Sequence, residues 1–138
     1  MGLKEKSDGL RKKEKGSSLE RYASSFKHAI EGFIYALRYE HNMIIIITCA
    51  IIAVVCGFVF KIEEAEWLFV LTMIGTISAV EMVNSSIEAA IDLTTTEIHP
   101  LAKIAKDTAS SATLILCITS LIGGLIIFIP KIMVLIGG

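Results

Sequence analysis

Three long apolar segments separated by short polar ones dominate this chain of 138 residues. They cover residues 43–60, 67–91 and 108–130. At 1.5 Å per residue, about 18 residues reach ~27 Å, which is enough for a helix to cross the hydrocarbon core of a bilayer. The pattern predicts an all-α integral membrane protein with three transmembrane helices. Trp67 is expected to anchor the second helix at the interface, and Pro130 is expected to end the third.

The segment before the first span has a different pattern. Over residues 24–42 apolar side chains recur at helical spacing, which predicts an amphipathic helix that packs on the bundle or lies in the membrane interface. The apolar stripe consists of Phe26, Ala29, Ile30, Phe33, Ile34 and Leu37. Residues 1–22 are polar and basic and are expected to be mobile, which leaves 23–138 as the membrane domain.

Composition and charge support this topology. Hydrophobic residues make up 54% of the chain, and its mean hydropathy is +0.68. Nine of the 13 Lys and Arg residues precede the first span. By the positive-inside rule the amino terminus is cytoplasmic, and three crossings of the bacterial plasma membrane leave the carboxyl terminus outside. Anionic lipid headgroups account for the basic segment, so no nucleic-acid partner is expected.

The second span carries a polar stripe near its carboxyl end. Glu81, Asn84, Glu88 and Asp92 fall within an arc of about 80° on one helix face. A carboxylate in hydrocarbon costs ~2.5 to 3.5 kcal/mol, so these side chains should face a bundle or a watery cleft. Helix–helix hydrogen bonding is the structural alternative, and a cation-coupled transporter or a scaffold subunit are functional ones.

A second polar group lies in the predicted cytoplasmic loop 92–106, just before the third span. There Asp107 and Thr108 are expected to cap the third helix, while Lys103 and Lys106 near its amino terminus would favour an anion such as phosphate. The lysines could instead be topology markers. Carboxylates for a divalent metal and a base beside such an anion site together favour phosphoryl transfer, although neither a P-loop nor the protein-kinase motifs occur.

These two segments resemble the signatures of the prokaryotic diacylglycerol kinase family. Residues 81–92 match the pattern E-x-x-N-S/T-A/S-I-E-x-x-x-D, and residues 99–107 match the second signature, which ends in A-K-D. The resemblance covers roughly residues 20–130. The sequence His-Pro-Leu-Ala-Lys at 99–103 looks more like the undecaprenol kinase branch.

The resemblance implies a role for individual residues. Glu81 falls on the general-base position, Glu40 and Glu88 on the metal-binding and ATP-binding positions, and Ser110 on a lipid-contacting one. Asn84 and Asp92 would support the site. Further nucleotide-binding positions are occupied by Arg21, Glu97, His99, Lys106 and Asp107, and by His28, where better-known members have tyrosine.

The resemblance also implies an activity and an assembly. An ATP-dependent lipid kinase is expected, in which Mg²⁺ bridges the ATP phosphates and the γ-phosphate passes to the primary hydroxyl of undecaprenol. Diacylglycerol is the alternative lipid alcohol. Family members are homotrimers with active sites shared between subunits, so a homotrimeric bundle in contact with membrane lipids is expected.

Overall fold

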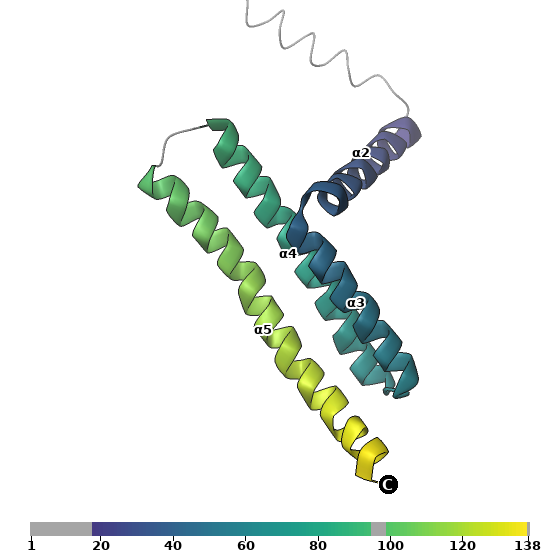
Figure 1. Cartoon of the computed structure of the whole chain (residues 1–138). Coiled ribbons are helices and arrows are strands. Elements are labelled where there is room, and N and C mark those ends of the chain that lie inside the picture. Colours follow the sequence, from purple (N-terminus) through teal and green to yellow (C-terminus); the bar gives the residue numbers. More distant parts are fainter. Residues whose placement is uncertain (1–17, 95–98, 138) are drawn as a thin grey trace, which may run out of the picture. The chain divides into compact units, whose positions relative to one another are not determined.

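The computed structural model describes residues 18–94 and 99–137. They form four helices, α2 (Ser18–Tyr39), α3 (His41–Val59), α4 (Glu64–Thr94) and α5 (Pro100–Gly137) (Figure 1). The chain divides into two units, one ending at Tyr35 and one beginning at Ala36, and each is described by itself.

The three helices of the second unit are each long and apolar enough to cross a membrane. The predicted all-α class with three spans is therefore confirmed. Helix α4 packs against both α3 and α5, while α3 and α5 approach each other where the ring centroids of Phe60 and Phe128 lie 6.1 Å apart. Most apolar side chains of this unit are exposed, as expected of helices that face lipid.

The first helix begins earlier than the sequence predicted. Ser18–Tyr22, expected to be mobile, are already helical, and the helix ends at Tyr39 rather than at residue 42. Glu40 separates α2 from α3 because its backbone is extended, with φ −97° and ψ 111°. Its N–H still donates to the Ala36 carbonyl at 3.0 Å, so the break is confined to one residue. That the apolar stripe of α2 lies on a membrane stays a prediction.

The prediction of a polar loop over residues 92–106 is wrong. Helix α4 continues to Thr94 and α5 begins at Pro100, a residue that suits the first turn of a helix because its missing N–H is not needed there. The His99 ring accepts a hydrogen bond from the Leu101 N–H at 3.2 Å and so caps α5. Asp107 and Thr108 therefore lie inside α5 and do not cap it.

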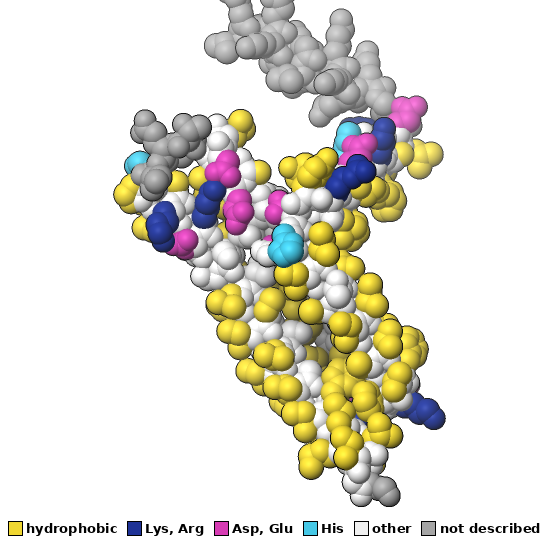
Figure 2. Space-filling model, viewed as in Figure 1, with side chains coloured by type: hydrophobic (Ala, Val, Ile, Leu, Met, Phe, Trp, Pro, Cys, Tyr) yellow, Lys and Arg dark blue, Asp and Glu magenta, His cyan; other side chains and the backbone are white. Residues whose placement is uncertain are grey.

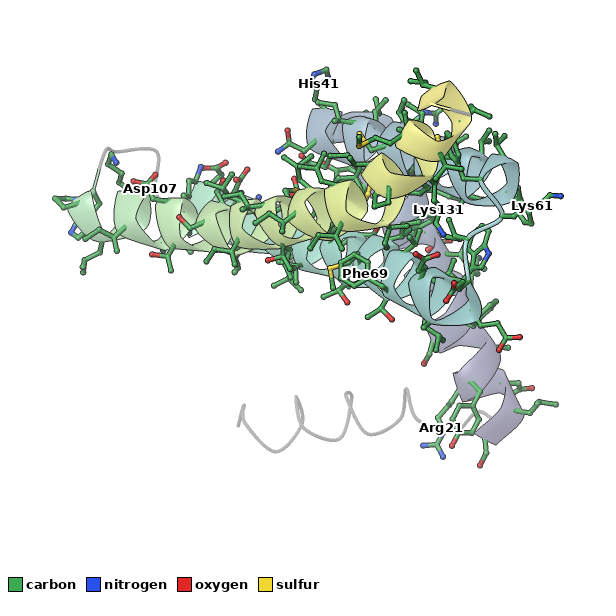
Figure 3. The ribbon with its side chains drawn as sticks, turned by 90° about the horizontal axis from the view of Figure 1, so that it is seen from below. Arg21, His41, Lys61, Phe69, Asp107 and Lys131 are labelled. Carbon is green, nitrogen blue, oxygen red and sulfur yellow. The ribbon has the colours of Figure 1, made fainter. Side chains whose placement is uncertain are left out.

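Pro130 does not end the third helix either. Helix α5 continues through it to Gly137. Proline removes one backbone hydrogen bond, a loss that membrane helices tolerate. Beyond Pro130, the Lys131 ammonium lies 2.9 Å from the Glu66 carboxylate on α4, which ties this segment to the rest of the unit (Figure 3).

The turn between α3 and α4 fixes their antiparallel register. Lys61 adopts a positive φ of 50°, and the Ile62 N–H donates back to the Gly57 carbonyl at 3.1 Å, as in a helix end closed by a left-handed residue. A Cβ on Gly57 would lie 2.7 Å from the Trp67 ring. The indole therefore packs directly on the α3 backbone, and only glycine leaves it room.

A similar close approach joins α4 to α5. A Cβ on Gly123 would lie 2.1 Å from the Phe69 ring, whereas one on the neighbouring Gly124 would meet nothing within 4 Å. Figure 3 labels Phe69 on the side of α4 that faces α5. The ring fills the space that Gly123 leaves on α5.

We predict that Gly123→Ala destabilises the protein by about 1 to 3 kcal/mol, because the new methyl group must displace the Phe69 ring. Gly124→Ala is the matched control and should be neutral or stabilising by up to ~1 kcal/mol, since alanine favours a helix and the site is open. Thermal unfolding in micelles measures both. Equal Tm values for the two variants would contradict this packing.

Candidate functional site

The predicted polar stripe runs from a buried to an exposed environment along α4. Glu81 and Asn84 are only 2% and 4% exposed, Glu88 is half-buried, and Asp92 is exposed. The stripe therefore begins inside the helix packing and ends at the surface, where charge is readily solvated.

Glu81 is covered by side chains of its own unit. Trp67 lies against Gly57, and Met43 precedes Gly57 along α3 by the same separation at which Glu81 follows Trp67 along α4. The antiparallel register therefore places Met43 level with Glu81, and these two are the largest fully buried side chains described. No hydrogen bond or ion pair within the described residues engages the Glu81 carboxylate, so it is free to accept a proton.

Asn84 connects the buried part of the stripe to its half-buried part. Its Nδ2 donates a hydrogen bond to Glu88 Oε1 at 3.2 Å, one turn further along α4. Its Oδ1 is buried and has no partner among the described residues. One edge of this amide thus orients Glu88, while the other edge has an unused acceptor.

Charged side chains gather at the end of the unit where α4 ends and α5 begins, which we call the polar end (Figure 2). Lys106 Nζ lies 2.5 Å from Asp92 Oδ1 and joins the two helices. Lys103 instead pairs with Asp107 within α5. The two lysines therefore differ, because Lys106 alone is held over the polar stripe and is half-buried.

An apolar groove of about 510 Å³ lies between α3 and α5, with α4 as its floor. Ile77 lines it one turn before Glu81, on the same side of α4. Cys49 and Cys117 line the walls at this end of the groove. The groove therefore leads along the apolar helices toward the buried carboxylate and is large enough for a hydrocarbon chain.

The carboxylates of Glu40 and Glu88 were predicted to bind a metal. Both are half-buried, and the Glu40 side chain makes no capping hydrogen bond to α3. Among the residues described, no group of three or more His, Cys, Asp or Glu side chains is arranged for a metal ion. Two carboxylates still fit Mg²⁺, which commonly binds one or two of them together with water and substrate phosphates.

The structure does not bring all the predicted residues together. Arg21 and His28 belong to the first unit, where the His28 ring lies 3.1 Å from Glu31. Glu97 lies outside the described residues. Ser110 is exposed on α5, and His99 uses Nδ1 to cap that helix. Their predicted contacts with nucleotide or lipid remain predictions.

Two side chains at this site were not found from the sequence. Met43 covers Glu81, and Thr113 on α5 is only 9% exposed, with a hydroxyl that has no partner within the described residues. Each looks like an ordinary member of an apolar span. The register between helices gives them their importance, and no local pattern reports it.

Comparisons with known proteins agree with these features. The family model described as "Prokaryotic diacylglycerol kinase" matches residues 27–128. The chain is 37% identical over 119 residues to an undecaprenol kinase from Bacillus subtilis, covering 86% of this chain and 97% of that protein. It is 35% identical over 101 residues to a diacylglycerol kinase from Helicobacter pylori strain J99, covering 73% and 79% respectively. A diacylglycerol kinase from Haemophilus influenzae is 28% identical over 115 residues, with 83% and 98% covered.

Proposed function

The chain belongs to the prokaryotic diacylglycerol kinase family, and on this premise we propose that it transfers the γ-phosphate of ATP to the primary hydroxyl of undecaprenol. The observation that carries the proposal is Glu81, a buried carboxylate beside an apolar groove and below a cluster of charges. A lipid alcohol in the groove would present its hydroxyl at this depth. Membership of a kinase family also favours phosphoryl transfer over the transporter and scaffold alternatives.

Undecaprenol is proposed over diacylglycerol for two reasons. The similarity to the Bacillus subtilis undecaprenol kinase extends over nearly the whole of that protein. The groove is lined almost entirely by apolar side chains, which suits a hydrocarbon chain without ester groups. Diacylglycerol remains the second candidate because several relatives are diacylglycerol kinases.

In the proposed reaction Glu81 accepts the proton of the lipid hydroxyl. The hydroxyl oxygen forms a bond to the γ-phosphorus, the bond from that phosphorus to the β–γ bridging oxygen breaks, and ADP leaves. Burial protects the carboxylate from bulk water and places it where the hydroxyl of a membrane lipid can reach. Lys106 exchanges Asp92 for the phosphate oxygens and stabilises their charge in the transition state.

Glu40 and Glu88 would hold Mg²⁺, with Asn84 fixing the orientation of Glu88. The ion would neutralise phosphate charge during the transfer. Arg21, His28, Glu97, His99 and Asp107 are proposed to contact the nucleotide and Ser110 the lipid.

We also propose that the protein works as a homotrimer with its amino terminus in the cytoplasm. Each unit buries Glu81 and Asn84 by itself, but Glu88 remains half-buried and long apolar helix faces are uncovered. A neighbouring subunit would cover part of these faces and close the site. The excess of basic residues before the first span supports the orientation.

The proposal predicts that purified protein in micelles consumes ATP only when a lipid alcohol is present. Labelled ATP offered in parallel with undecaprenol and diacylglycerol should label undecaprenol with the higher kcat/KM. Preferential labelling of diacylglycerol would contradict the choice of substrate. ATP consumption without lipid, or no consumption with either alcohol, would contradict the function itself.

Glu81→Gln should lower turnover by ~10²-fold or more, because the amide keeps the shape of the side chain but cannot accept the proton. Binding of ATP, followed by equilibrium dialysis, should be nearly unchanged. Glu64→Gln, at the exposed start of α4, is the matched control and should keep full activity. A Glu81→Gln protein with more than about a tenth of the normal turnover would contradict the assignment of Glu81 as base.

Lys106→Ala should lower kcat/KM for ATP by about 10²-fold, because it removes a cation held over the stripe. Lys103→Ala should have little effect, since Lys103 pairs within α5 and is exposed. The comparison uses proteins shown to assemble alike, with KM measured for ATP and for the lipid alcohol. Small and equal effects at both positions would support the view that both lysines are only topology markers.

A further inference from the structure

Two buried polar atoms on facing helices have no hydrogen-bond partner among the residues described. They are Asn84 Oδ1 on α4 and Thr113 Oγ1 on α5. An unpaired buried polar group costs about 1 to 3 kcal/mol, so two of them within one small helical unit call for a common explanation.

The register of α4 and α5 brings these atoms to the same level. Glu66 and Lys131 form an ion pair of 2.9 Å across the two helices. Asn84 follows Glu66 along α4 by the same separation at which Thr113 precedes Lys131 along α5. That separation equals about five full helical turns, so Asn84 shares the face of Glu66 and Thr113 shares the face of Lys131.

The ion pair at the polar end gives the same alignment. Lys106 meets Asp92, and from this pair Thr113 lies two turns on along α5 while Asn84 lies two turns back along α4. The two levels agree within one residue, or about 1.5 Å. Two independent anchors therefore place the Thr113 side chain opposite Asn84.

The Thr113 hydroxyl also differs from other hydroxyls in these helices. Thr48, Ser86, Ser111 and Thr119 each donate to the backbone carbonyl four residues earlier, at 2.7 to 2.9 Å. Thr113 makes no such bond, although Ser111 and Thr119 on the same helix do. Its hydroxyl is therefore available to α4.

We propose that Thr113 Oγ1 and Asn84 Oδ1 together hold one buried water molecule, and that Thr113 is a positioning residue for Glu88. The water would donate to Asn84 Oδ1 and bond to the Thr113 hydroxyl, which satisfies both atoms. With Oδ1 fixed toward α5, the Asn84 amide cannot turn, and its Nδ2 stays directed at Glu88 Oε1. The catalytic consequence rests on the proposed function, whereas the contact itself does not.

The test compares Thr113→Val, which removes the hydroxyl and keeps the shape, with Thr113→Ser, which keeps the hydroxyl. Thr119→Val is the control, because the Thr119 hydroxyl is bonded within its own helix. The side-chain amide resonance of Asn84 in micelles, assigned by its loss in Asn84→Leu, is the main readout. It should shift in Thr113→Val and stay in place in Thr113→Ser and Thr119→Val.

The Tm gives an independent readout. If the hydroxyl is part of the water site, Thr113→Val lowers the Tm, since Asn84 Oδ1 loses its bridge; an idle hydroxyl would instead give a higher Tm on replacement by valine. Should valine fail to fold, Thr113→Ala is the second hydroxyl-free variant. An unmoved Asn84 resonance together with a raised Tm would overturn the inference.

In the kinase assay Thr113→Val should lower kcat about tenfold with an unchanged KM for the lipid alcohol, and Thr113→Ser should restore it. An unchanged kcat, with the resonance shifted, would overturn the positioning role while leaving the water site in place. The resonance and the Tm need no substrate. They decide the contact even if the proposed kinase activity is not found.

Discussion

The burial of one carboxylate at membrane depth is the constraint on which the arrangement of this protein depends. Glu81 cannot face lipid without a cost of ~2.5 to 3.5 kcal/mol, so α4 must be the central helix, packed by α3 and α5. Met43 covers Glu81 from α3. Toward the polar end, the same face of α4 opens gradually to the surface through Glu88 and Asp92. A protected base and a solvated group of charges thus lie on one helix.

The position of this stripe is set by contacts far from it. Trp67 against Gly57 and Phe69 against Gly123 bring the helix backbones close together at the opposite end, and the Glu66–Lys131 ion pair holds the segment after Pro130. Helices are stiff, so a register fixed at one end determines which side chains meet several turns away. Changes at either glycine are therefore expected to reach the polar end through the register.

The sequence predicted the class of fold, the three spans and the polar face of α4, because each rests on a local pattern of apolar and charged residues. It misplaced the ends of the helices. The segment 92–106 is polar but largely helical where described, since helix formation there needs no apolar stripe, and Pro130 reads as a stop although the helix continues. The roles of Met43 and Thr113 depend on which residues face each other across helices, and a single sequence carries no local signal for that register.

The two lysines at the polar end show why pairing matters more than charge alone. Lys103 and Lys106 are three residues apart, and either could mark the cytoplasmic side. Lys103 pairs with Asp107 on its own helix, but Lys106 reaches across to Asp92 on the helix that carries Glu81. A solvent-exposed ion pair contributes only ~0 to 1 kcal/mol, so Asp92 keeps Lys106 in place at little cost when the lysine turns to a more highly charged anion. On the proposed function this anion is the phosphate of ATP, and the pair holds a cation over the stripe before the nucleotide arrives.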